Sequence, residues 1–240
     1  EFLAFLFDGE LRPVPHASGD LQRAIVDRRI SFGRDALEFS GNSRSERVLG
    51  AIIGVKDYPP HSSAGQMDVL LRTPHEMVVS QSFGFVDRQT SLNRMNLALR
   101  RMRAADDEAL SLRRDLVQAK DDVAAGRSVF GEHTFTVMVR ATDFTALDNA
   151  VADVQSALTD VGMIGVREDV ALEPAFWGQF PGNSSFIPRK SLVSSANFAG
   201  LASFHNHPVG RPQDNHWGPA VTVLETTAAS PYYFNFHQGD

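Results

Sequence analysis

Cysteine is missing from all 240 residues of the chain. Its absence excludes a disulfide framework, a thiolate zinc site and a cysteine nucleophile. Long apolar runs are missing as well. Residues 2–7 are apolar, but the run stops at Asp8, far short of the ~20 residues that span a bilayer. No basic segment precedes this run, so we expect no signal peptide.

Positive charge is in deficit, because 23 Lys and Arg face 29 Asp and Glu, a net charge of -6. Binding to nucleic-acid phosphates or anionic lipid needs a basic surface, so we expect no direct nucleic-acid binding. The hydrophobic content of 42% and charged content of 22% are typical of a soluble globular protein with an ordinary core. The first residue is not methionine, and we therefore expect a piece of a larger protein.

Signatures of catalysis are also absent. The chain holds no G-x-S-x-G, no HExxH, no GxGxxG after a strand and no Walker A sequence. His205 and His207 resemble the start of a zinc metalloisopeptidase motif, and His216 and His237 could add ligands. The downstream aspartate of that motif is missing, since Gly218 stands near its place. We therefore favour structural histidines over a metal hydrolase, and predict no catalytic, cofactor-binding or metal residue.

What is present indicates an α+β fold with mixed or antiparallel sheets. We expect a first region over residues 1–130, in which apolar runs predict strands at 2–7, 31–39, 48–55 and 76–85. A long amphipathic helix is expected over residues 88–125. Its apolar positions are three or four residues apart, with a phase slip around Ala105.

This narrow apolar seam has two interpretations. We favour a hairpin or a single long helix lying across its own domain, and the alternative is a helix that binds a partner in a stand-alone interaction module. The candidate interface residues on the seam are Leu92, Leu99, Leu112 and Leu116.

Residues 131–173 predict a strand–helix–strand unit. Strand-forming residues fill 133–140, and Asp143 is a suitable N-cap for a helix with apolar residues every three or four positions. Gly162 ends this helix and a second strand follows. A ferredoxin-like βαβ layer is the simplest interpretation.

Residues 174–240 are rich in proline and glycine, and their helical periodicity disappears. We expect a loop-rich segment with short strands at 220–226 and 232–236. Large aromatic residues in such a segment usually fold back as a small core, which we favour, whereas an exposed cluster would mark an interface. The candidate interface residues here are Phe176, Trp177 and Trp217.

Several motifs in order resemble the CagE/TrbE/VirB family of type IV secretion ATPases. They are residues 173–183 (EPAFWGQFPGN), 197–199 (NFA), 205–210 (HNHPVG), 217–220 (WGPA) and 231–237 (PYYFNFH). Upstream, residues 58–59 (YP), 81–83 (QSF), 126–127 (GR) and 130–133 (FGEH) are also similar to that family. The resemblance covers nearly the whole chain.

The resemblance implies the amino-terminal portion of a large ATPase, with residues 174–240 leading into a motor domain that is cut off at the threshold of its P-loop. ATP and magnesium are implied for the parent protein and none for this chain, since nothing here matches the Walker A lysine or Walker B acid. The implied partners are inner-membrane components of a secretion channel and further copies of the protein. The implied location is peripheral, on the cytoplasmic face of the bacterial inner membrane.

Overall fold

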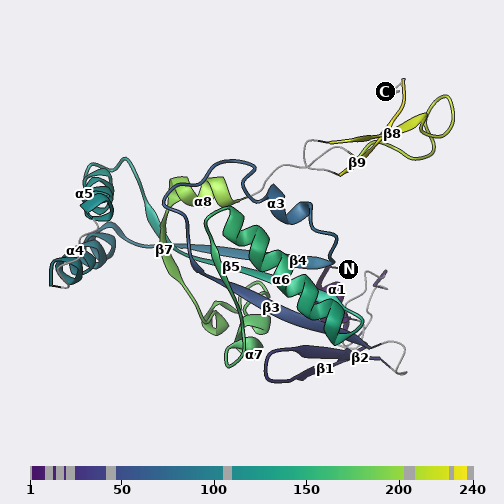
Figure 1. Ribbon diagram of the computed structural model, residues 1–240, viewed down its shortest axis with the longest axis horizontal. Coiled ribbons are helices and arrows are strands. Elements are labelled where there is room, and N and C mark those ends of the chain that lie inside the picture. Colours follow the sequence, from purple (N-terminus) through teal and green to yellow (C-terminus); the bar gives the residue numbers. More distant parts are fainter. Residues whose placement is uncertain are drawn as a thin grey trace.

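The computed structural model describes residues 2–8, 13–14, 19, 25–41, 47–104, 110–202, 209–226 and 230–236. A seven-stranded antiparallel sheet forms the body, with helices on both faces, and a two-stranded sheet near the C-terminus lies apart from it (Figure 1). The expected α+β class with antiparallel sheets is therefore confirmed.

The large sheet is built around two long central strands. Its members are β1 (Arg29–Phe32), β2 (Leu37–Ser40), β3 (Val48–Asp57), β4 (Met77–Phe85), β5 (Phe130–Ala141), β6 (Ile164–Arg167) and β7 (Ser191–Ser194). The main order is β1-β2-β3-β5-β4, while β6 pairs with the later part of β3 and β7 with the first part of β5. Strand β4 therefore forms one edge of the sheet.

Strands β3 and β5 are covered on both faces, which explains their nearly continuous apolar sequences. Successive residues point to opposite faces, so Ile52 and Met138 enter one core while Ile53 and Val137 enter the other. The prediction of a central strand at residues 48–55 is confirmed.

Helix α6 (Phe144–Asp160) covers one face of the sheet, together with the short α3 (Asp68–Leu71) (Figure 1). The Asp143 carboxylate accepts a hydrogen bond of 2.9 Å from the Ala146 backbone N–H, a cap worth about 1 kcal/mol. Gly162 follows the helix at a φ of 77°, in the left-handed region that favours glycine. Both predicted ends of this helix are confirmed.

The strand–helix–strand unit predicted for residues 131–173 is present as β5, α6 and β6. Strands β5 and β6 both pair antiparallel with β3, which lies between them, so they run parallel to each other. Helix α6 is the crossover that joins them.

The opposite face is covered by α1 (Phe2–Asp8) and α7 (Leu172–Trp177). The strand predicted at residues 2–7 is wrong, because these residues form a helix. A short apolar run does not distinguish the two structures, and what holds this one is distant in sequence. The buried Arg140 guanidinium donates a hydrogen bond of 3.0 Å to the Phe5 carbonyl and stacks on the Phe5 ring.

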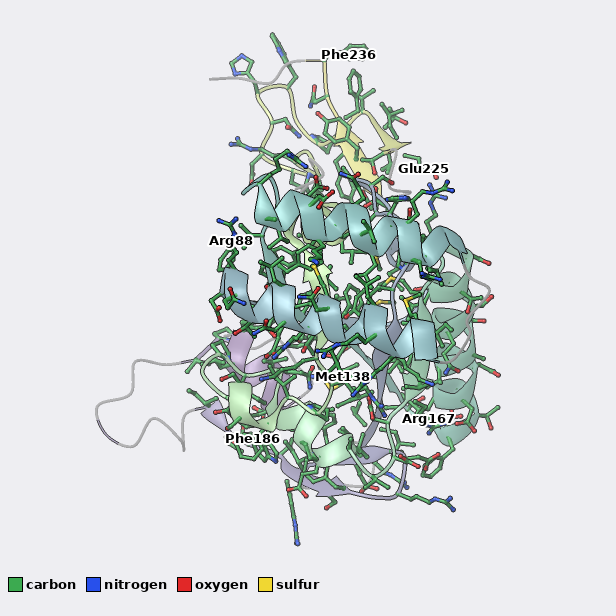
Figure 2. The ribbon with its side chains drawn as sticks, turned by 90° about the vertical axis from the view of Figure 1, so that its left-hand side faces the viewer. Arg88, Met138, Arg167, Phe186, Glu225 and Phe236 are labelled. Carbon is green, nitrogen blue, oxygen red and sulfur yellow. The ribbon has the colours of Figure 1, made fainter. Side chains whose placement is uncertain are left out.

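The single long helix expected over residues 88–125 is two helices in the structure. These are α4 (Arg88–Ala104) and α5 (Leu110–Ala124), which lie side by side at one end of the sheet (Figures 1 and 2). The Arg88 guanidinium at the start of α4 donates to the Ala124 carbonyl at the end of α5, so the pair is antiparallel. We call α4 and α5 together the hairpin.

The segment after residue 174 holds more regular structure than its composition predicted. Besides β7, it contains a 3-10 turn η2 (Ser184–Phe186) and helix α8 (Ser195–Leu201). Strands β8 (Thr222–Glu225) and β9 (Pro231–Phe234) then form the two-stranded sheet. The two strands predicted here are confirmed, although each is shorter than expected.

Candidate interaction surfaces

The aromatic residues at 176–180 pack into the body of the protein. Phe176 is fully buried, with ring centroids 5.5 Å from Phe32 and 6.2 Å from Phe39. Trp177 is half-buried beside it and lies 6.2 Å from Phe7 of α1. The structure therefore joins α1, β1, β2 and α7 through one aromatic cluster, as the core interpretation predicted.

The four candidate interface residues of the hairpin differ in their exposure to solvent. Leu99 and Met95 on α4 and Val123 on α5 are buried, and Leu92 and Leu116 are half-buried. Leu112 is 54% exposed. The large apolar side chains that α4 and α5 leave exposed are Leu97, Leu112 and Val117.

The hairpin is fixed to the sheet at its base. Arg94 on α4 pairs with Glu132 on β5 at 2.9 Å, and Lys190 approaches the same carboxylate at 3.7 Å. The Arg94 hydrogen bond holds the pKa of Glu132 below its ordinary value. Because these ion pairs lie on the exposed surface, they contribute little to stability. They link helix α4 to the sheet.

The C-terminal two-stranded sheet has an apolar surface. Trp217 is 70% exposed, with its ring centroid 5.0 Å from that of His216. Other exposed apolar side chains on this unit are Val221, Val223, Leu224 and Phe236. Tyr233 donates its backbone N–H to the Val209 carbonyl at 2.7 Å, which ties the strand pair to the preceding chain.

Of the four histidines considered as metal ligands, His216 lies in the described part of the chain. Among the described residues, no group of three or more His, Cys, Asp or Glu side chains could hold a metal ion. His205, His207 and His237 lie outside the described residues.

Sequence reasoning missed a charged pair inside the body. Glu168 is buried and accepts two hydrogen bonds from the Arg189 guanidinium, at 2.7 and 3.1 Å. Such a two-pronged pair is among the stronger ionic contacts, and it raises the pKa of Arg189. A Cβ atom on Gly54 would lie 2.1 Å from the Glu168 carboxylate, so glycine there makes room for the pair.

Sequence reasoning also gave no role to His133, although its motif supported the family resemblance. The imidazole is buried, with its ring 5.2 Å from Tyr58 and 5.3 Å from Phe198. Its Nε2 atom lies 3.1 Å from the Gln81 amide oxygen. Burial lowers the pKa of His133 to about 4, so the ring is neutral at pH 7.

A small polar cavity lies between the β4–β5 pair and the segment from α7 to Pro188. The side chains of Ser80, Ser82, Thr134 and Thr136 line it. Its volume is about 40 Å³, which suits one or two water molecules and not a nucleotide. We assign it no catalytic role.

None of the helices in the described residues combines the length and the apolar composition of a membrane span.

Comparison with known proteins gives one family. Residues 1–189 match the CagE, TrbE, VirB family, a component of the type IV transporter system. The chain is 38% identical over 240 residues to the type IV secretion system protein virB4 of Bartonella henselae. It is 33% identical over 235 residues to the type IV secretion system protein PtlC homolog of Bordetella bronchiseptica, and 31% identical over 240 residues to protein virB4 of Agrobacterium fabrum.

These three alignments cover 98% to 100% of this chain and 28% to 30% of the relatives. The chain thus spans less than a third of the length of these relatives, at their N-terminal end. Since the family match extends over residues 1–189 of 240, the chain belongs to the CagE, TrbE, VirB family of type IV transporter components.

Proposed function

We propose that this chain is the amino-terminal docking, oligomerisation and regulatory portion of a type IV secretion ATPase. The parent enzyme would energise channel assembly and the export of DNA or protein. The family membership and the partial coverage of the relatives support this assignment. Because the chain has no Walker A sequence, we assign ATP and magnesium to the remainder of the full-length protein.

The hairpin is the observation that carries the docking role. It lies at one end of the sheet, away from α6 and from α7 (Figure 1). Some of its apolar residues are buried, yet Leu97, Leu112 and Val117 remain exposed on it. Exposed apolar residues gathered on one projecting element are typical of an interaction site.

The charge of helix α4 indicates the kind of partner. Helix α4 contains five arginines and no acidic residue, in a chain whose net charge is -6. Arg100 and Arg101 are exposed on it. A partner with an acidic and partly apolar surface would fit this helix.

We propose inner-membrane components of the secretion channel as that partner. The protein would then be peripheral, on the cytoplasmic face of the bacterial inner membrane.

We also propose a division of labour along the chain. The order β6-β3-β5-β4 and the α6 crossover support a ferredoxin-like unit as the rigid base from which the hairpin projects. The exposed apolar residues of the β8–β9 unit support a role for this unit as the connection to the motor domain of the parent protein.

Nucleotide binding tests the assignment of this chain as non-catalytic. We expect isothermal titration with ATP and magnesium to show no saturable binding, and a phosphate-release assay to show no turnover. The physical reason is that no glycine-rich loop cradles phosphates in this sequence. Micromolar binding accompanied by turnover would contradict the proposal.

A further inference from the structure

Strand β4 is an edge strand that the described part of the chain leaves open. It is nine residues long and its one strand partner is β5. The Val86 N–H bonds to the Phe130 carbonyl and the Arg140 N–H to the Glu76 carbonyl. In an antiparallel ladder these bonds fall on alternate residues, so the even-numbered residues of β4 face β5.

The odd-numbered residues of β4 direct their backbone groups the other way, out of the sheet. These residues are Met77, Val79, Gln81, Phe83 and Phe85. Among the described residues, no other group accepts from or donates to the backbone of β4. An open row of N–H and C=O groups is a template for another strand.

The other edges in the described structure carry features that discourage strand addition, and β4 does not. The other strands with a single strand partner, β1, β6, β7, β8 and β9, are each only four residues long, and β1, β6, β8 and β9 also contain Arg29, Arg167, Glu225 and Pro231. Strand β4 has the sequence MVVSQSFGF, with no charge and no proline. Val79 is 42% exposed and Phe85 is 78% exposed.

The sequence of β4 matches a second copy of itself in one antiparallel register. If a two-fold axis passes through Gln81, Val79 of one copy lies opposite Phe83 of the other, and Met77 lies opposite Phe85. Each of these pairs joins two odd-numbered residues, so both partners offer free backbone groups. Aromatic–aliphatic pairs across antiparallel strands are favourable, and the exposed Phe85 gains an apolar neighbour.

The charges at the strand ends favour the same arrangement. The antiparallel register places Glu76 opposite Val86 of the other copy and His75 opposite Asp87, so no two identical charges face each other directly. A parallel pairing of two copies would instead place Glu76 beside Glu76 and Asp87 beside Asp87. Like charges facing each other destabilise a sheet, so the antiparallel register is preferred.

We propose that β4 is a homodimerisation edge, at which two copies of this chain join their sheets antiparallel about Gln81. The interface is isologous, since the same strand is used by both copies. The proposal stands on the geometry of β4 and not on the docking role of the hairpin, so either can fail without the other.

A pair of double variants tests the surface. Sedimentation velocity over a concentration series is expected to show the unmodified chain moving from monomer to dimer mass. Val79→Lys with Phe85→Lys should keep it monomeric, because like charges would gather at the shared edge. The matched control is Val170→Lys with Phe236→Lys, which replaces a 94% exposed valine and a 72% exposed phenylalanine elsewhere. The control should dimerise as the unmodified chain does.

A single cysteine tests the register and does not depend on weakening the dimer. The chain has no cysteine, so Gln81→Cys introduces the one thiol. Opposed residues of a bonded pair lie about 5.5 Å apart between Cα atoms, within disulfide range. Mild oxidation should therefore link two copies, whereas Val170→Cys should link few.

Three results would overturn the proposal: a monomer at every concentration, a charged β4 variant that still dimerises, or equal cross-linking by the two cysteine variants. Far-ultraviolet circular dichroism of each variant checks that its fold is retained.

Discussion

At the scale of single residues, His133 shows how burial can give this fold a dependence on pH. Its imidazole is packed among aromatic rings and its pKa is lowered to about 4, against an ordinary value of 6.5. The folded state therefore binds this proton less well than the unfolded state does. The contribution of neutral His133 to the free energy of unfolding is fully present above pH 6.5, and it is lost as the pH falls toward 4.

We predict that this residue alone lowers the free energy of unfolding by about 2 kcal/mol between pH 7 and pH 5. Urea unfolding at the two pH values measures the loss. The glutamine side chain in His133→Gln does not titrate. The decrease in the free energy of unfolding of this variant between pH 7 and pH 5 should therefore be about 2 kcal/mol smaller, whatever the stability of the variant at pH 7. An equal loss in both proteins would show that His133 is not the group responsible.

Local residue signals were the most predictable part of the chain. Asp143 and Gly162 act on the backbone next to them, so their capping roles follow from sequence alone and are confirmed. Arg140, Glu168 and Arg189 act on partners far along the chain. Nothing in the neighbouring sequence indicates such partners, and these contacts were therefore missed.

At the scale of elements, the structure of the hairpin distinguishes the seam residues that are buried from those that are exposed, which the sequence pattern did not. Leu99 on α4 is buried, whereas Leu112 on α5 is 54% exposed. We predict that Leu99→Asp destabilises the protein by several kcal/mol, roughly the 2–5 of a large core deletion, because it buries a charge. Leu112→Asp should change stability by less than about 0.5 kcal/mol.

Thermal or urea unfolding of the two variants, side by side, measures this difference. A large loss of stability in Leu112→Asp would mean that Leu112 is part of the core, and the proposed docking surface would then lose its main residue.

The spacing of apolar residues predicted helical structure in this region but did not decide between a hairpin and a single long helix. The phase slip around Ala105 falls between the bounds of α4 and α5. A slip of that kind is a weak signal, since a continuous helix tolerates it as well. Residues 2–7 show the same limit, because their periodicity does not reveal that α1 packs on Arg140 and α7.

At the scale of the whole molecule, the described residues combine a sheet covered on both faces with several surfaces that these residues leave open. These are the hairpin, the edge of β4 and the β8–β9 unit (Figures 1 and 2). A body with a complete core and several open surfaces suits a protein that holds others in place. This arrangement agrees with a chain that covers 30% of a longer relative.

Binding to the secretion channel tests the central claim most directly. The measurement is the affinity of this chain for the purified inner-membrane components of its own secretion system, by biolayer interferometry, with Val170→Asp as the control. We predict saturable binding that Leu112→Asp weakens at least about tenfold, or ~1.4 kcal/mol, and that the control leaves unchanged. Absence of binding by the unmodified chain, or equal binding by Leu112→Asp, would contradict the account.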